Sequence, residues 1–225
     1  MKYSITDEDF MKFKAAIFDL DGTLLDSMKI WSNLCNEFLL RHNINEVIDL
    51  DGKLGVISMR NALEYLIREF SIDISIETAY RETWLIVEEF YNLHAQIKPG
   101  IPAILEHLQN NNIPCGIITA TETGLVIPAL KRTGLHGYFK EIFSCSEMNT
   151  SKRTPEVFYQ MSELLGAEPA DTIVFEDALY AALTAKKAGY SVAAVYDPSE
   201  KNPSLLQETA DFYCRCWQNL PLEHL

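Results

Sequence analysis

The apolar positions of the chain change their spacing twice. The run Lys14–Asp19 is almost wholly apolar and predicts a buried strand. Between Met28 and Leu93, apolar residues recur every three or four positions, which predicts helices. From Pro102 to Val195, short apolar runs alternate with helical segments. Strands that alternate with helices predict a parallel sheet covered by helices on both faces.

The segment between Met28 and Leu93 is predicted to hold three helices and no strand. Their apolar faces are Ile30, Trp31, Leu34, Cys35, Phe38 and Leu39; then Met59, Leu63, Leu66, Ile67 and Phe70; and last Tyr80, Trp84, Val87, Phe90 and Tyr91. Asn43 is expected to end the first helix. Because this block follows the first strand directly, we expect residues 27–95 to form a separate helical domain. It would be inserted into an α/β core domain made of residues 1–26 and 96–225.

The second half of the chain is predicted to add four strands, each preceded by a helix. We expect the strands at 115–119, 141–145, 172–176 and 191–195, and the helices at 102–109, 127–133, 155–165 and in the alanine-rich stretch before Gly189. Thr154 is expected to cap the helix that begins at Pro155. The fold class is therefore α/β, with an inserted all-helical domain.

Composition narrows the choice of ligand. The chain has 225 residues, enough for one large domain or a core with an insert, and its 48% hydrophobic content is typical of globular proteins. Its formal net charge is −13, from 19 Lys and Arg against 32 Asp and Glu. Such a chain repels a nucleic-acid backbone, so we expect no nucleic-acid partner. An anionic ligand would have to be attracted by a local site.

The sequence shows no sign of a membrane or an oxidising compartment. Its first ten residues lack an apolar signal core, and no run is long enough to span a bilayer. The five cysteines are an odd number, and Cys214-Arg-Cys216 lacks the spacing of a zinc or redox pair. We therefore expect a cytoplasmic protein with reduced thiols and no membrane partner.

Polar residues follow several of the predicted strands. Asp19 and Asp21 end the first strand, Thr119 ends the second, and Glu176-Asp177 follow a later one, while Lys152 precedes a helix. The carboxyl ends of parallel strands meet at one edge of a sheet, where such folds bind ligands. Two carboxylates as close as Asp19 and Asp21 need a cation between them or a proton. We therefore expect Mg²⁺-assisted phosphate chemistry at this edge.

Each of these groups suits a step of phosphoryl transfer. Asp19 is a candidate nucleophile that would form an aspartyl phosphate, and Asp21 a candidate acid and base. Asp177 would complete a Mg²⁺ site with Asp19, because Mg²⁺ prefers carboxylate, phosphate and water oxygens. Thr119 and the Lys152 ammonium would hold the phosphoryl oxygens.

Four motifs in order resemble those of the haloacid dehalogenase superfamily. They are Asp19-Leu-Asp-Gly-Thr23, Ile117-Ile-Thr-Ala120, Lys152 with Pro155-Glu-Val-Phe158, and Val174-Phe-Glu-Asp177. The helical insertion is similar to the cap of the β-phosphoglucomutase-like and phosphoglycolate phosphatase-like branch. The resemblance implies a Rossmann-like core with a helical cap domain. It also implies a metal site of Asp19, Asp21, Glu176 and Asp177, with phosphate bound by Thr119, Ala120 and Lys152.

The sequence departs from the superfamily pattern at the third motif. It reads Ser-Lys-Arg-Thr-Pro where relatives often have Gly-Lys-Pro-x-Pro, so the loop around Lys152 differs from the family pattern while the catalytic groups are retained. A dehalogenase would lack Asp21, and a phosphonate hydrolase would need a lysine near Ser58-Met59-Arg60, where Lys53 is an imperfect substitute. Both reactions are therefore disfavoured.

Several similar residues have simpler interpretations. Asp49-Leu-Asp-Gly52 repeats four letters of the first motif, but it lies inside the helical block and predicts a solvated turn. Asp26 and Ser27 are expected to cap the first helix of that block. Arg60 and Lys53 are weaker candidates for contact with a substrate. Whether Glu176 binds the metal directly stays open.

The leading hypothesis is a phosphomonoester hydrolase acting on a small phosphorylated metabolite, as a monomer or homodimer. A β-phosphoglucomutase-like sugar-phosphate mutase is the alternative. The mutase differs from the hydrolase in keeping water out of the site while an intermediate reorients. Thr23 favours the hydrolase mildly, since the β-phosphoglucomutases used for comparison have another residue there. A third reading, a binding protein without catalysis, conflicts with the intact set of polar residues.

Overall fold

A computed structural model describes residues 7–45 and 59–215. The chain divides into two compact units. One combines Met1–Ser27 with Ala95–Leu225, and the other is Met28–His94. No helix in the described ranges is long and apolar enough to cross a membrane.

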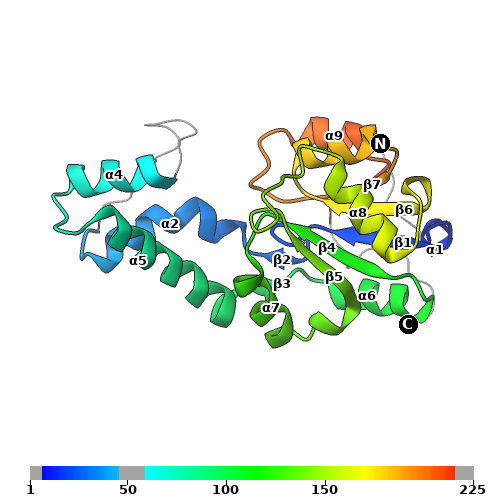
Figure 1. Cartoon of the computed structure of the whole chain (residues 1–225), viewed down its shortest axis with the longest axis horizontal. Helices are drawn as coiled ribbons and strands as arrows, with labels where there is room; N and C mark the ends of the chain where they lie inside the picture. Colours follow the sequence, from blue (N-terminus) through cyan, green and yellow to red (C-terminus); the bar gives the residue numbers. More distant parts are fainter. Residues whose placement is uncertain (1–6, 46–58, 216–225) are drawn as a thin grey trace. The chain divides into compact units, whose positions relative to one another are not determined.

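A six-stranded parallel sheet forms the centre of the first unit (Figure 1). Its strands, in chain order, are β1 (Ala15–Phe18), β4 (Cys115–Thr119), β5 (Phe139–Ser144), β6 (Thr172–Glu176), β7 (Ser191–Val195) and β8 (Phe212–Cys214). In space the order is β5-β4-β1-β6-β7-β8, so the first strand of the sequence lies in the middle of the sheet. The predicted α/β fold class is confirmed.

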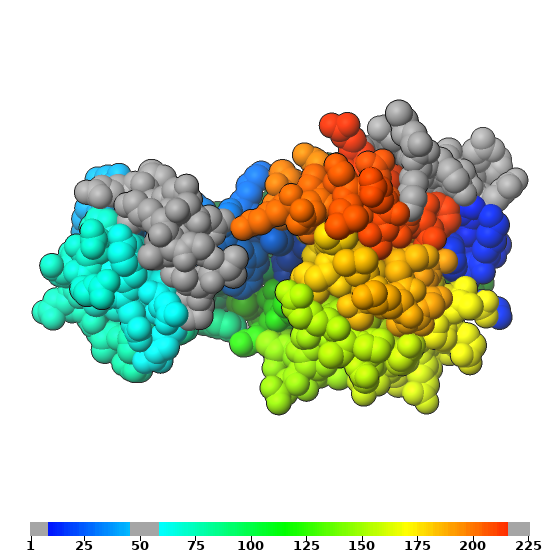
Figure 2. Space-filling view, turned by 90° about the horizontal axis from the view of Figure 1, so that it is seen from above, coloured from blue at the N-terminus to red at the C-terminus, as the bar shows by residue number. Residues whose placement is uncertain are grey.

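Helices cover both faces of this sheet, which explains why its central strands are apolar on both sides. The helices are α1 (Asp7–Phe10), α6 (Ile101–Asn110), α7 (Thr123–Arg132), α8 (Glu156–Leu165), α9 (Leu179–Lys187) and α10 (Pro203–Thr209). Figure 1 shows α8 and α9 on one face and α6 and α7 on the other. In Figure 2, the segments coloured yellow-green to orange, which include α8 and α9, form a continuous surface over the first of these faces.

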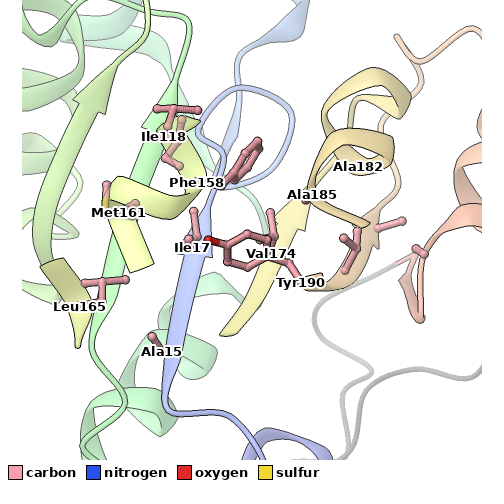
Figure 3. Close-up of a cluster of buried hydrophobic side chains, with 14 of the residues drawn as sticks. Ala15, Ile17, Ile118, Phe158, Met161, Leu165, Val174, Ala182, Ala185 and Tyr190 are labelled. Atoms are coloured by element: carbon pink, nitrogen blue, oxygen red, sulfur yellow. The ribbon is translucent and has the colours of Figure 1, made fainter. Parts of the chain in front are cut away.

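The two faces of β1 pack against different kinds of side chain. On one face, Ile17 and Val174 meet Phe158 and Met161 of α8 in a buried cluster (Figure 3). On the other face, the rings of Phe18 and Phe175 stack with their centroids 4.5 Å apart. Burying apolar side chains on both faces strongly stabilises this strand and holds its carboxyl end in place.

The regular elements in the described residues of the second unit are all helical. It contains α2 (Met28–Arg41), α4 (Met59–Glu69) and α5 (Ile76–Glu89), followed by a π-helical segment, Phe90–His94. Its core includes Ile30, Leu34, Phe38, Leu63, Leu66, Ile86 and Val87. Asn43 has a positive φ of 59° just after the end of α2, in agreement with the predicted helix stop.

Two short strands, β2 (Leu25–Asp26) and β3 (Gln96–Ile97), pair antiparallel at the points where the chain leaves and re-enters the first unit. Their pairing joins Leu25 with Ile97 and Asp26 with Gln96. Two residues are too few to show a strand period, so the sequence did not predict them.

The structure corrects some predicted boundaries. The residue at the N-cap of α8 is Pro155, and the Thr154 hydroxyl donates to the carbonyl of Ser151 at 3.3 Å, so the predicted Thr154 cap is wrong. Helix α7 begins at Thr123 and contains Pro128, whereas the apolar pattern predicted a start at 127. Strand β8 was not predicted, because its three residues are too few to show a period.

Candidate active site

The candidate residues of the first unit come from strand ends that share one edge of the sheet. Asp19 follows β1, and its N–H donates to the carbonyl of Phe175 in β6 at 2.9 Å. This bond places the residues after β1 beside Glu176, the last residue of β6. On the other side of β1, β4 ends at Thr119.

Three buried carboxylates form a cluster at this edge. Asp19, Glu176 and Asp177 each offer an oxygen, and these oxygens lie within 4.8 Å of one another. The side chains are nearly inaccessible to solvent, with exposures of 6%, 1% and 5%. One cation joins them, because the Lys152 Nζ, itself 4% exposed, donates to Asp19 Oδ1 and to Glu176 Oε2, the latter at 2.8 Å. The cluster therefore holds more acidic groups than basic ones.

The excess of carboxylates appears in their pKa values. Burial, together with the nearby charges of Glu176 and Asp21, raises the pKa of Asp19 to about 7 against the opposing effect of Lys152. Burial and the charges of Asp19 and Glu176 also raise the pKa of Asp177 well above its usual range. For Lys152, burial lowers the pKa, but the two carboxylates outweigh it and the net shift is upward.

One oxygen of the cluster has no partner. Asp19 Oδ2 is buried and accepts no hydrogen bond from any described residue. A buried carboxylate oxygen without a donor is unfavourable unless a ligand meets it. Asp19, Glu176 and Asp177 each bring one carboxylate oxygen to the cluster, a donor set that fits a hard divalent cation, so the residues present could hold a metal ion.

Asp21 lies two residues further on, and its carboxylate is not part of that group of three. Its Oδ1 accepts from the hydroxyl of Ser27 at 2.5 Å, and its Oδ2 accepts from the hydroxyl of Thr121 at 2.6 Å. The geometry thus gives no support to the Asp21 side chain as a metal ligand. Sequence reasoning missed Thr121, and it took Ser27 only for a helix cap, because isolated hydroxyl residues near helix starts are common.

A tight turn directly follows the two aspartates. Gly22 has a φ of 84°, a conformation that favours glycine, and its N–H donates to the carbonyl of Leu25 at 2.9 Å. The next residue, Thr23, is fully buried, and its hydroxyl has no hydrogen-bond partner among the described residues. This turn explains why glycine follows Asp21 in the motif.

The loop after β4 carries the predicted phosphate-binding residues. The Thr119 hydroxyl is buried and accepts from the backbone N–H of Thr121 at 3.0 Å, while Ala120 between them is exposed. Across the edge, the loop before α8 is held by Arg153, whose guanidinium carbon lies 4.4 Å from the ring centroid of Tyr180. The loop with the unusual Lys152-Arg153 sequence thus still places a buried lysine within hydrogen-bond distance of the carboxylates.

Other candidates from the sequence lie elsewhere. Arg60, in the helical unit, pairs with Glu64 at 2.9 Å on an exposed helix surface. Lys53 and the second Asp-Leu-Asp-Gly segment, residues 49–52, lie outside the described residues. The four cysteines in the described ranges are free thiols, and Cys216 is outside them.

Comparison with known proteins decides the family. Residues 16–195 match the model of the family described as haloacid dehalogenase-like hydrolase. The chain belongs to this family. The matched region contains all four predicted motifs, so the predicted family and the expectation of a hydrolytic enzyme are confirmed.

Curated relatives of this family member include several phosphatases. Hexitol phosphatase A of Escherichia coli is 29% identical over 194 residues, covering 84% of this chain and 86% of the relative. Fructose-1-phosphate phosphatase YqaB of the same organism is 23% identical over 190 residues, covering 83% and 98%.

Solved structures confirm the fold of this hydrolase. A Thermotoga maritima protein assigned as a β-phosphoglucomutase superposes with a TM-score of 0.79 at 23% identity, covering 89% of this chain and 94% of that chain. CbbY of Rhodobacter sphaeroides, solved with phosphate, gives 0.70 at 18% identity, covering 92% and 96%. At these identities the similarity bears on the fold alone.

Proposed function

We propose that the protein is a Mg²⁺-dependent phosphomonoester hydrolase that works through an aspartyl phosphate on Asp19. The observation that carries the proposal is the buried cluster at the sheet edge, where Lys152 binds one oxygen of Asp19 and the other oxygen has no partner among the described residues. A purely structural ion pair would not leave a buried carboxylate oxygen unsatisfied. The names of the curated relatives, which act on small phosphorylated sugars and sugar alcohols, support the same conclusion.

The proposed reaction has two steps. An oxygen of Asp19 attacks phosphorus, the bond from phosphorus to the ester oxygen breaks, and the leaving oxygen takes a proton from Asp21. A water molecule then attacks the phosphorus of the aspartyl phosphate and gives a proton to Asp21. The products are the alcohol, inorganic phosphate and the original carboxylate of Asp19.

The other residues neutralise and orient the phosphoryl group. Lys152 supplies a fixed positive charge, and the Thr119 hydroxyl can donate to a phosphoryl oxygen because it already accepts from Thr121. Ala120 would contribute its backbone N–H. When bound, Mg²⁺ would be held by Asp19 and Asp177, with Glu176 beside them, and would offset the negative charge of the phosphoryl oxygens.

We propose that the helical unit serves as the cap domain that selects the substrate. Its described surface exposes large side chains, among them Trp31, Tyr80 and Trp84. The substrate would be a small phosphorylated metabolite of the sugar or sugar-alcohol class.

A simple assay tests the chemistry. The protein should release phosphate from p-nitrophenyl phosphate with Mg²⁺, and Asp19→Asn should lower the rate at least about 10³-fold, because the amide cannot form the acyl phosphate. Asp171→Asn is a matched control, since Asp171 lies exposed at the amino end of β6 and pairs with Lys14 at 2.6 Å. The control should keep its activity, and activity that survives in Asp19→Asn would overturn the proposal.

A substrate screen separates hydrolase from mutase. Hexose, hexitol and glycolate phosphates should release inorganic phosphate without a bisphosphate activator. Formation of an isomeric sugar phosphate only with a catalytic amount of bisphosphate would instead show a mutase.

A further inference from the structure

The carboxylate of Asp21 is held by two hydroxyl groups, one on each oxygen. Ser27 donates to Oδ1 at 2.5 Å and Thr121 donates to Oδ2 at 2.6 Å. Ser27 is fully buried and Thr121 is 7% exposed, so neither hydroxyl is on the open surface. The two donors come from separate segments: Ser27 directly follows β2, and Thr121 lies in the loop after β4.

Two donors restrict this carboxylate more than one would. The last torsion of an aspartate is broad, and a single hydrogen bond leaves rotation about it available. Donors on both oxygens fix the carboxylate plane, and charge-assisted bonds of this length are among the stronger ones. Asp21 is itself only half-buried, so water could solvate its oxygens without either hydroxyl. The two hydroxyl groups therefore orient the Asp21 carboxylate, which water could solvate without them.

The Thr121 side chain is tied to the other side of the site through its own backbone. Its N–H donates to the Thr119 hydroxyl at 3.0 Å while its hydroxyl binds Asp21. One short loop thus fixes both the hydroxyl expected to bind the phosphoryl group and the direction of the candidate acid. A shift in this loop would move the two together.

We propose that Thr121 is a positioning residue for proton transfer, and that Ser27 assists it by holding the second oxygen of Asp21. The inference rests on the proposed function, in which Asp21 gives a proton to the leaving oxygen. Thr121 itself touches no reacting atom. Its contribution is to keep the carboxyl group aimed at the ester oxygen of a phosphate bound by Thr119.

This role predicts a dependence on the leaving group. The alcohol of a sugar phosphate is a poor leaving group and needs a proton as the bond breaks, whereas p-nitrophenolate leaves without one. Loss of the Thr121 hydroxyl should therefore slow alkyl phosphates more than aryl phosphates. A residue that only stabilises the fold would slow both classes by the same factor.

The test compares Thr121→Val, which keeps the shape, with Thr121→Ser, which keeps the hydroxyl. The ratio of kcat/KM for glycerol 2-phosphate to that for p-nitrophenyl phosphate is measured in each full-length variant with Mg²⁺. We expect the ratio to fall at least about tenfold in Thr121→Val, within the usual range for general acid catalysis, and to return to within about threefold in Thr121→Ser. Thr123→Val is the matched control two residues further on, at the start of α7, because the Thr123 hydroxyl binds Glu147 at 2.8 Å and not Asp21.

Ser27→Ala provides a second measurement if Thr121→Val does not fold. Ser27→Ala should lower the same ratio of kcat/KM values, because the Ser27 hydroxyl that it removes holds the other oxygen of Asp21. Equal losses on both substrates, or a ratio that Thr121→Ser does not restore, would overturn the inference while leaving the proposed function intact. A wild-type protein that hydrolyses neither substrate would overturn the proposed function itself.

Discussion

Two buried lysines of the core unit bind carboxylates, and their surroundings differ in charge. Lys98 pairs with Asp197 at 2.8 Å, with side-chain exposures of 11% and 2%, and Asp197 also accepts from the backbone and hydroxyl of Ser199. Lys152 instead meets two carboxylates of a cluster of three. The first pair is balanced in charge, and the second is not.

The pKa shifts of the two regions have opposite signs. Burial alone would raise the pKa of Asp197, but the hydrogen bonds from Lys98 and Ser199 outweigh burial and lower it. The pKa of Asp19 is instead raised. A buried lysine with one carboxylate carries no net charge and needs no further partner. A buried cluster with more carboxylates than cations is stable only with an added proton or a further cation. Burial of a lysine–carboxylate pair therefore says little about function; the charge balance around it says more.

Replacing Lys152 should have the largest effect on activity. Lys152→Met removes the cation that binds Asp19 and is proposed to bind the phosphoryl group, and we expect kcat to fall about 10³-fold. The measurement is phosphate release from p-nitrophenyl phosphate at saturating Mg²⁺. Lys98→Met is the matched control and should keep kcat within about threefold at a temperature where it is folded. Similar losses in both variants would show that the two regions do not differ as proposed.

Replacing Lys98 should instead have the larger effect on stability. Lys98→Met leaves the nearly inaccessible Asp197 without its cation, and we expect the free energy of unfolding to fall by about 3 kcal/mol. Urea denaturation with Mg²⁺ present measures this change. The double variant with Asp197→Asn should recover part of the loss, because no charge is then left buried without a partner. No recovery would mean that packing, and not charge, explains the destabilisation.

The two regions should also respond oppositely to pH. Asp19 has a pKa of about 7 in the fold against an ordinary 3.8, so the folded state holds the proton more tightly and stability without metal falls as pH rises from about 4 to about 7. The lowered pKa of Asp197 gives a contribution that is present above its ordinary 3.8 and is lost as pH falls through the lower value.

Unfolding free energies measured by urea from pH 3 to pH 8, with EDTA or with Mg²⁺, check both trends. Mg²⁺ should remove the decline towards neutral pH, and Asp19→Asn should reduce it. Asp197→Asn should have a lower free energy of unfolding than the wild type near neutral pH, and this difference should disappear at the acidic end of the range. A decline that neither Mg²⁺ nor Asp19→Asn changes would contradict the assignment to this cluster.

The smallest effect is expected at Thr23, whose buried hydroxyl has no partner among the described residues. Thr23→Val keeps the shape and removes the unsatisfied group, so stability should stay equal or rise by up to about 1 kcal/mol. Thermal denaturation measures the change. A marked loss of stability would mean that the hydroxyl has a bound partner, such as water, in the folded protein.

The sequence predicted the parts of the site that depend on strand ends. Asp19, Thr119 and Glu176 each lie at or next to the end of an apolar run, so the parallel-sheet rule was enough to bring them together. Lys152 and its neighbours needed the resemblance to the family. The partners of Asp21 could not be predicted, because Ser27 and Thr121 carry no periodic or compositional signal and their role depends on side-chain orientation.

The fold was predicted most reliably where burial is greatest. The limits of β4, β6 and β7 agree with the apolar runs, because the central strands are buried on both faces. Strand β8 and the pair β2 and β3 contain two or three residues each and were missed. The alternation of long apolar runs thus predicts the architecture, while short connections depend on tertiary contacts.

The central place of β1 has a consequence for how the protein reaches its fold during synthesis. Its neighbours are β4, which ends at Thr119, and β6, which ends at Glu176, so β1 has no partner until about half of the 225 residues are made and lacks its second partner for longer. The helical unit needs only contacts among its own residues and can condense earlier. The segment that carries the proposed nucleophile is thus made early but positioned late, and a chain interrupted before β6 would lack Glu176 and Asp177 of the candidate site.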